Sequence, residues 1–320
     1  MTALGTILRP FFGVSEREAS FSEGDRQAAQ RLETAVRMVT QGCHITLKNS
    51  RFDALVSRMD AVDPELRGFA YEGVGVGLAA LDCLLPWKNR TREFLDGPGA
   101  AYIYAVSLGA GMGLARLHRN PEKFLPRLDP TFGWLILDGY GFHQGFFSQQ
   151  LYIEKRAIPG FLSPYGRRVF DHGLGRSLWF VSGTNVERVA AKIATFAESR
   201  WSDLWSGVGL ACGYTGGVDR ATIEALREIA GPHRQQLAIG AAIAANARQL
   251  AHSPGPYAEL ACEVLCGQSS AEVSRITEIA LESIPAQRSE PAYELWRQQI
   301  SAQIVVPTGS QAKSETQPRV

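Results

Sequence analysis

Several ionisable side chains are spaced so that they could act together as a general acid and base. Asp171 and His172 are adjacent, and Arg176 follows four residues later on the same face of a predicted helix. His143 belongs to an earlier helical segment. Because histidine titrates near neutral pH, this group could exchange a proton with a ligand. The alternative is a buried polar network that fixes helix packing, with Arg176 paired to a carboxylate.

Two carboxylates occur in the most apolar stretch of the chain. Glu72 and Asp82 are ten residues apart, nearly three helical turns, so they lie on roughly the same side of a helix. A carboxylate in an apolar segment is costly unless it is paired. The two could act as acid and base, hold a metal ion, or form two structural salt bridges. This pair is our second choice for a site.

A small-residue motif, Gly-x-Gly or an alanine-rich equivalent, recurs along the chain. Its copies start at Gly73, Gly109, Gly145, Gly173, Gly207 and Gly240, at steps of 36, 36, 28, 34 and 33 residues. A period near 34 residues is typical of stacked two-helix repeats. A glycine inside a helix costs about 1 kcal/mol relative to alanine, so the motif indicates close helix packing or close approach of a ligand.

The residues just before these glycines should project in similar directions from successive helices. They are Glu72, Leu108, Gln144, His172, Ser206 and Ile239. We predict that Gln144, His172 and Ser206 face one groove, with His143, Asp171 and Arg176 close by. The candidate catalytic residues are Glu72, His143, Asp171, His172 and Arg176. The candidate ligand-binding residues are Asp138, Tyr140, Gln144, Trp205 and Ser206.

The repeat predicts an all-α protein. We expect about six helix pairs between Leu66 and Ile284, stacked as a curved α-solenoid similar to tetratricopeptide repeats. Capping boxes that start at Thr184 and Ser269 predict two helix N-termini. The expected divisions are an N-terminal segment with a leading helix (1–65), the repeat domain (66–284), a C-terminal helix (285–306) and a disordered tail (307–320).

Composition excludes several classes of function. The chain has 33 Lys+Arg and 32 Asp+Glu, a net charge of +1, which argues against nucleic-acid binding and a polybasic membrane anchor. No uncharged apolar run reaches about 18 residues, so no membrane span is expected. We also expect no signal peptide. Five widely spaced cysteines fit a reduced, cytoplasmic protein.

No tightly bound cofactor is expected. Nucleotides need a phosphate cradle at the start of a helix, and the glycine motifs do not follow strands. Haem and iron–sulfur sites need cysteine or histidine at ligand spacing, and Cys262 and Cys266 are the only local cysteine pair. A metal ion bound by residues from separate repeats stays open as an alternative. Its candidate ligands are Glu72, Asp82, Asp138 and His143.

Four segments of the chain carry a family resemblance: Gly68–Asp82, Leu137–Phe146, Asp171–Phe180 and Asp203–Ala211. In this order they resemble a bacterial family of unknown function that is found in enediyne antibiotic gene clusters. The resemblance runs from about residue 10 to residue 250. It implies a biosynthetic pathway and assigns no catalytic residues. The segment Leu210-Ala-Cys-Gly-Tyr214 is similar to the core of tetratricopeptide repeats, which implies architecture alone.

Two functions are therefore expected from different classes. The protein could bind or transform an apolar, polyene-like intermediate of enediyne or polyketide-type biosynthesis in a groove lined by aromatic side chains. Alternatively, it could be a non-catalytic scaffold that holds pathway proteins on a concave face. The positions of Glu72, Asp138, His172 and Arg176 separate the two. Burial in a cavity favours a small molecule, and a broad open face favours a protein partner.

Overall fold

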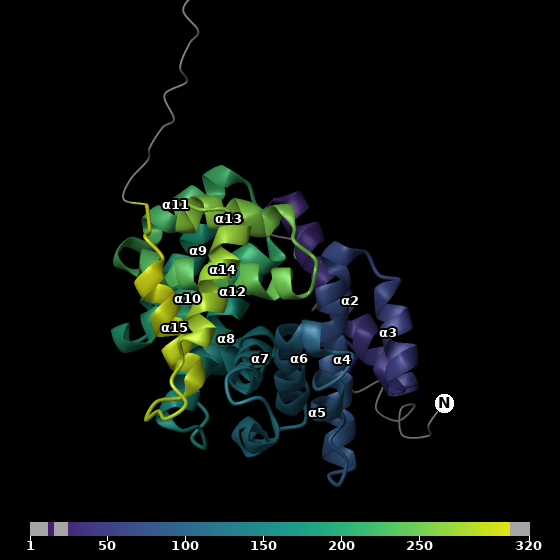
Figure 1. Ribbon diagram of the computed structural model, residues 1–320. Coiled ribbons are helices and arrows are strands. Elements are labelled where there is room, and N and C mark those ends of the chain that lie inside the picture. The colour runs from purple at the N-terminus through teal and green to yellow at the C-terminus, as the bar shows by residue number, and fades with distance from the viewer. Residues whose placement is uncertain (1–11, 16–24, 308–320) are drawn as a thin grey trace, which may run out of the picture.

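Helices make up all of the regular structure in residues 12–15 and 25–307, the part of the chain that the computed structural model describes (Figure 1). The prediction of an all-α protein is therefore confirmed. The predicted tail falls, apart from Pro307, outside the described residues. Among the described helices, none is both long and apolar enough to span a membrane. Seven longer helices form the centre of the fold: α2 (Arg26–Lys48), α4 (Pro64–Leu84), α6 (Ile103–Arg116), α7 (Leu135–Phe147), α8 (Pro164–Val181), α10 (Glu198–Thr215) and α12 (Arg234–Leu250).

Shorter elements connect these helices and lie outside them. After α7 the connecting element is a π-helix, and after α6 it is of the 3-10 type. The connecting elements are α3 (Phe52–Asp60), α5 (Arg90–Leu95), η2 (Ala100–Tyr102), η3 (Pro121–Arg127), η4 (Phe132–Trp134), η5 (Gln150–Glu154), α9 (Val186–Ala194), α11 (Arg220–Ala230) and η6 (Gly231–His233). The chain then continues through α13 (Pro256–Cys266), α14 (Ser270–Glu282) and α15 (Ala292–Gln303). The expected alternation of two α-helices is thus interrupted in the middle of the repeat.

The two predicted capping boxes have different outcomes. At α14 the box is confirmed, because Ser269 and Glu272 satisfy each other's backbone N–H groups. At α9 the prediction is wrong by one residue. Asn185 is the N-cap, and its side chain accepts a hydrogen bond from the N–H of Arg188 at 2.8 Å.

The glycine motifs lie inside helices, where neighbouring backbones touch. A Cβ atom at Gly109 would overlap the carbonyl oxygen of Glu72, and one at Gly173 would overlap that of Asp138. The same contact recurs between successive helices. The first glycine of each copy packs against the residue just before the first glycine of the preceding copy. The pairs are Gly109–Glu72, Gly139–Leu108, Gly173–Asp138, Gly207–His172 and Gly240–Ser206.

These contacts show that the sequence analysis placed the third copy of the motif at the wrong glycine. The equivalent glycines are Gly139 and Gly141, whose added Cβ atoms would meet backbone of α6 and α8. A Cβ at Gly145 would meet side chains of Leu174 and Ser177 instead. The residue at the pre-glycine position of this repeat is therefore Asp138, and the assignment of Gln144 to it is wrong. Helix α2 joins the row through Gly42, which packs against Ala70.

The row of helices folds back on itself. Successive members are parallel, because Gly42 faces Ala70 while Thr46, one turn further, faces Gly77. Helix α2 also touches α10, and α6 touches α12. Arg31 Nε donates to the carbonyl of Thr215 at 2.8 Å. These contacts enclose an interior between the helices, and the structure does not confirm an open, curved solenoid.

Candidate functional site

A buried polar network crosses this interior. Arg176 Nη1 on α8 donates to Asp138 Oδ1 on α7 at 2.8 Å, and its Nη2 donates to Glu72 Oε1 on α4 at 3.3 Å. His172 Nδ1 lies 2.6 Å from Asp138 Oδ2. All four side chains are buried. We call these residues the Arg176 network.

The repeat explains why these residues meet. Glu72, Asp138 and His172 each precede the first glycine of their copy, so they occupy equivalent positions on parallel helices. The glycine contacts bring adjacent helices close enough for the side chains at these positions to touch. Arg176 lies one turn beyond His172 and reaches back across the interior toward both carboxylates.

The two carboxyl groups of the network have pKa values shifted in opposite directions. Burial raises the pKa of Glu72, and the nearby charge of Arg176 only partly opposes this effect. Burial would also raise the pKa of Asp138, but the charges and hydrogen bonds of Arg176 and His172 outweigh it and hold the pKa below its usual range. Glu72 is thus the carboxyl group of the network that takes up a proton more readily. When it is protonated, it can donate a hydrogen bond.

An apolar pocket lies against one end of this network. It encloses about 750 Å³, a volume that includes solvent at its opening. Its walls come from α2, α4, α6, α7 and α8, with the segment 12–14 and Thr215 completing them. Glu72 and Arg176 form part of the wall. Six phenylalanines supply most of the aromatic surface: Phe12, Phe69, Phe142, Phe146, Phe147 and Phe180.

Two further ionisable side chains, His143 and Arg116, line the pocket. His143 is buried, and its Nδ1 has no hydrogen-bond partner among the described residues. Burial, reinforced by the charge of Arg116, lowers the pKa of His143 to about 3, so its ring is neutral at physiological pH. The Arg116 guanidinium lies 5.7 Å from the centre of the Phe147 ring, and that of Arg176 lies 4.9 Å from the centre of the Phe142 ring.

The structure brings together some of the predicted catalytic residues and separates another. Glu72, His143 and Arg176 line the pocket, and His172 lies behind them in the network. Asp171 does not belong to this group. Its carboxylate pairs with Arg200, with Nε at 2.9 Å from Oδ2, and burial raises its pKa to about 6. Adjacent helical residues point about 100° apart, so His172 and Asp171 face different neighbours.

The predicted ligand-binding residues are likewise divided. Gln144 is turned away from the pocket, and its amide donates to the hydroxyls of Tyr140 and Tyr152 at 3.2 and 3.4 Å. Trp205 and Ser206 are buried and do not line the pocket. The predicted common groove for Gln144, His172 and Ser206 is therefore wrong. For Gln144 the cause is the shifted third copy of the motif, which places Asp138 where Gln144 was expected.

Glu72 and Asp82 do not converge. The carboxylate of Asp82 accepts hydrogen bonds from the backbone N–H groups of Arg90 and Thr91 at 2.9 Å and from the Thr91 hydroxyl at 2.8 Å. Asp82 thereby holds the start of α5 against the end of α4, which is a structural task. Within the described part of the chain, no three His, Cys, Asp or Glu side chains are grouped as metal ligands.

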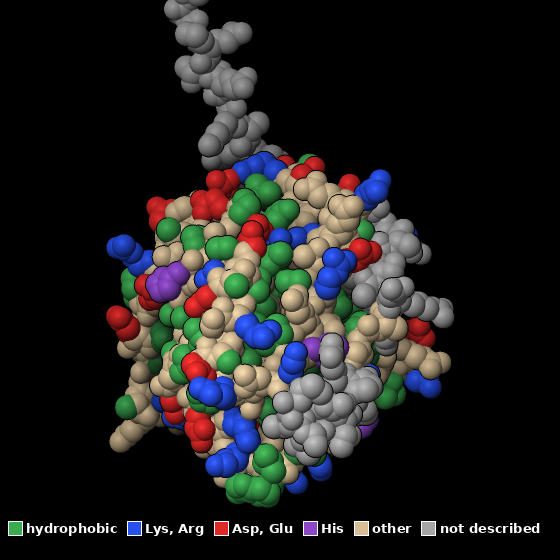
Figure 2. Space-filling model, turned by 90° about the vertical axis from the view of Figure 1, so that its right-hand side faces the viewer, with side chains coloured by type: hydrophobic (Ala, Val, Ile, Leu, Met, Phe, Trp, Pro, Cys, Tyr) green, Lys and Arg blue, Asp and Glu red, His purple; other side chains and the backbone are tan. Residues whose placement is uncertain are grey.

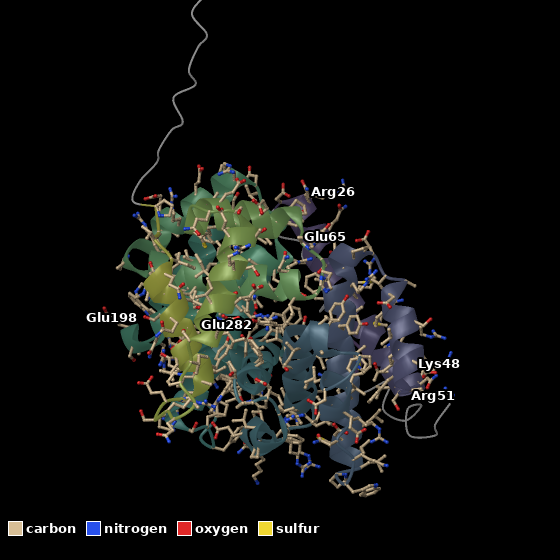
Figure 3. All side chains as sticks on the ribbon, viewed as in Figure 1. Arg26, Lys48, Arg51, Glu65, Glu198 and Glu282 are labelled. Atoms are coloured by element: carbon tan, nitrogen blue, oxygen red, sulfur yellow. The ribbon has the colours of Figure 1, made fainter. Side chains whose placement is uncertain are left out.

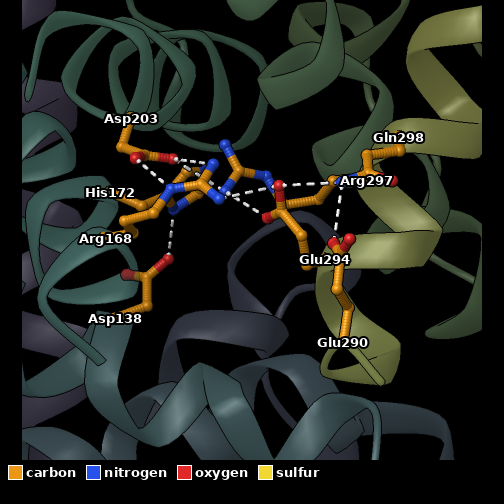
Figure 4. A network of polar contacts seen from close by, with 8 residues as sticks. All are labelled: Asp138, Arg168, His172, Asp203, Glu290, Glu294, Arg297 and Gln298. Carbon is orange, nitrogen blue, oxygen red and sulfur yellow. Dashed lines mark hydrogen bonds and ion pairs between the residues drawn. The ribbon is translucent and has the colours of Figure 1, made fainter. Parts of the chain in front are cut away.

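A second polar network was not predicted from the sequence. Asp203 on α10 accepts hydrogen bonds from Arg168 at 3.0 Å and from Arg297 at 2.8 Å, and Glu294 accepts one from Arg168 at 2.8 Å (Figure 4). These contacts attach α15 to α8 and α10. The spacing of Glu294 and Arg297, three residues apart on one helix, was the available signal. Their partners lie about 90 and 130 residues away, so sequence spacing could not identify them.

The chain belongs to a family described as "Protein of unknown function (DUF1702)", whose profile matches residues 7–304. The match covers all of the helices described above. No match was found among curated proteins or among solved structures. The function must therefore be argued from the pocket and the network themselves.

Proposed function

We propose that this protein binds an apolar, polyene-like small molecule in the pocket, and that Glu72 and His143 contact its polar or reactive part. The observation that carries the proposal is a buried, protonatable carboxyl group in the wall of a pocket lined by six phenylalanines. Ligand sites are mostly apolar and aromatic, with a few polar groups that fix orientation. In this pocket, Glu72 and His143 are the polar groups that would fix the orientation of the ligand.

The burial of the Arg176 network supports a small-molecule function over a scaffold. Glu72, Asp138, His172 and Arg176 face the interior and are at most 7% exposed. A protein partner on an open face could not reach them. The four motifs that resemble a family of enediyne gene clusters support a polyketide-type intermediate as the ligand. We place the protein in such a pathway, in the cytoplasm.

The network also suggests which side chains would transfer protons in a reaction. A protonated Glu72 could transfer its proton to the bound molecule, and the carboxylate that remains would be stabilised by Arg176. Asp138 and His172 would keep the Arg176 guanidinium in place. His143, neutral and with a nitrogen lacking a partner in the described structure, could accept a proton or a hydrogen bond. No cofactor is needed for such proton transfer.

Binding can be tested with cis-parinaric acid, a conjugated tetraene whose fluorescence rises in apolar surroundings. We expect saturable binding to the wild-type protein. Val36→Trp should fill the pocket from α2 and weaken binding about tenfold or more, equivalent to about 1.4 kcal/mol. Val56→Trp is a matched control, because Val56 is also half-buried but lies on α3 outside the pocket.

The outcomes separate a real site from nonspecific adsorption. Equal affinities of the two tryptophan variants would contradict the proposal, as would a wild-type protein that shows no saturable binding. Glu72→Gln keeps the shape of the pocket and removes its ionisable carboxyl group. We expect this variant to bind the probe and to lose any dependence of affinity on pH that arises from Glu72.

A further inference from the structure

We propose that residues 84–87, the last residue of α4 and the turn that follows it, form a tip that docks the protein reversibly on an anionic membrane surface. This inference does not require the proposed ligand. We call Leu84, Leu85, Pro86 and Trp87 the α4 tip. They form a short, apolar projection at the lower end of the molecule in the view of Figure 1.

The exposure of the α4 tip is unusual for its residue types. Trp87 is 73% exposed and Leu84 is 41% exposed. The other five tryptophans of the chain are buried or half-buried. Tryptophan combines a large apolar ring with one N–H donor, so it is favoured where water meets the lipid headgroups. Moving an exposed ring from water into such an interface lowers the free energy.

The base of the α4 tip is held firmly. Asp82 accepts three hydrogen bonds from the start of α5. Further along α5, Phe94 packs edge-on against Phe52 of α3, with ring centres 5.1 Å apart. This arrangement presents the tip outward rather than folding it over the core.

The part of the chain that follows the α4 tip is rich in basic residues. Between Trp87 and Arg127 the chain has seven Lys+Arg and three Asp+Glu, although the whole chain carries only +1. Contacts gather several of them near the tip. Arg92 Nη1 donates to the carbonyl of Arg127 at 3.5 Å, and the charge of Arg119 acts on Cys83. Arg90 and Arg92 are also paired, with Asp82 and Asp96, so the excess charge comes from the other basic residues. The seven basic residues are Lys88, Arg90, Arg92, Arg116, Arg119, Lys123 and Arg127.

The figures show the same arrangement at the surface. In Figure 2, hydrophobic side chains gather at the lower end of the molecule with basic side chains beside them. In Figure 3, Lys48 and Arg51 point outward from the ends of α2 and the following loop. Arg51 pairs with Asp53, Nη2 to Oδ2 at 2.8 Å, so it adds little net charge on this side of the molecule. Local positive charge attracts anionic lipid within a Debye length.

The shape and position favour a membrane over a protein partner. Protein interfaces are broad patches with an apolar core, whereas the α4 tip is a narrow projection with basic surroundings. Interfacial tryptophan beside lysine and arginine is typical of proteins that lie on a bilayer. The pocket approaches the same end of the molecule, because Arg116 lines it and ends α6. A lipid surface is also where apolar small molecules accumulate.

The test is vesicle co-sedimentation with the full chain. One set of vesicles is phosphatidylcholine, and the other contains about 30% phosphatidylglycerol. We expect binding to the anionic vesicles, with weaker binding to the neutral ones and at high salt. Trp87→Ala should lower the partition coefficient about tenfold. Ile279→Ala is the control, since Ile279 is 49% exposed on α14, and it should change partitioning less than about twofold.

Tryptophan emission provides an independent readout. Because Trp87 is much the most exposed tryptophan, vesicle binding should shift the emission of the wild-type protein to shorter wavelength and leave that of Trp87→Ala unchanged. Failure of the wild-type protein to bind anionic vesicles would overturn the proposal. Equal binding by Trp87→Ala would do so as well. Trp87-dependent dimerisation without vesicle binding would instead assign the tip to a second copy of the chain.

Discussion

Replacing Gly139 by alanine tests the register of the repeat directly. A Cβ atom at this position would overlap the carbonyl oxygen of Leu108 and approach its Cα at 2.9 Å. Both partners are helix backbone, so no rotamer change can relieve the overlap, and α6 and α7 must move apart. Asp138 is the preceding residue, so this movement would also disturb its contacts with Arg176 and His172.

The expected magnitude follows from two opposing effects. Alanine favours the helix over glycine by about 1 kcal/mol. Inserting a methyl group into well-packed structure costs about 1–3 kcal/mol, and more where backbone must shift. Because the contact here is entirely with backbone, we expect Gly139→Ala to lower the free energy of unfolding by about 2 kcal/mol or more.

Urea unfolding followed by circular dichroism measures this change, and two matched variants set the scale. Gly145→Ala meets Leu174 and Ser177 side chains, which can shift, so its loss should be smaller. Gly160→Ala has nothing within 4 Å of the added Cβ, and its stability should stay within about 0.5 kcal/mol of wild type. The reasoning would be refuted if Gly139→Ala were as stable as Gly160→Ala, or if Gly145→Ala were the most damaging of the three.

Two further predictions concern the charges of the interior. Arg176→Met should cost about 3–5 kcal/mol of stability, because it leaves the Glu72 and Asp138 carboxylates buried without their cation; Asp138→Asn in the same chain should recover part of this loss, and a double variant no better than the single one would count against the network. The folded-state pKa of His143 is about 3, against an ordinary value of 6.5. Between these values the unfolded chain binds a proton that the folded chain does not, so acidification should destabilise the protein. From pH 7 to 5 the loss due to His143 should be about 2 kcal/mol. His143→Gln should show a correspondingly smaller change over this interval, and identical pH profiles for the two proteins would refute the assignment.

The sequence was sufficient for the secondary-structure class and for part of the site. Glycines at a regular period with helical flanks predicted that the motifs lie inside packed helices, and they do. The third copy was misplaced because a constant step of 36 residues selected Gly145. The sequence itself contained the better match, Gly139-Tyr-Gly141. Choosing it would have placed Asp138 beside His172, as the structure does.

Other features could not be obtained from spacing along the chain. Asp171 and His172 were grouped because they are adjacent, but adjacent helical residues diverge, and Arg200 was not foreseeable as the partner of Asp171. The pocket combines residues from six helices, with Thr215 from the end of α10, and from the segment 12–14. Its composition depends on how the row of helices folds back. That closure includes long-range contacts such as Arg31 with Thr215 and Tyr104 with Asn246, which no local pattern predicts.

The glycine contacts also determine which residues can vary without altering the fold. Each contact uses the carbonyl group of a pre-glycine residue and leaves the side chain of that residue out of the packing between backbones. The same backbone frame therefore presents glutamate, leucine, aspartate, histidine, serine and isoleucine at equivalent places: Glu72, Leu108, Asp138, His172, Ser206 and Ile239. A chain built in this way can exchange the chemistry of its interior one helix at a time, while the glycines keep the helices in register.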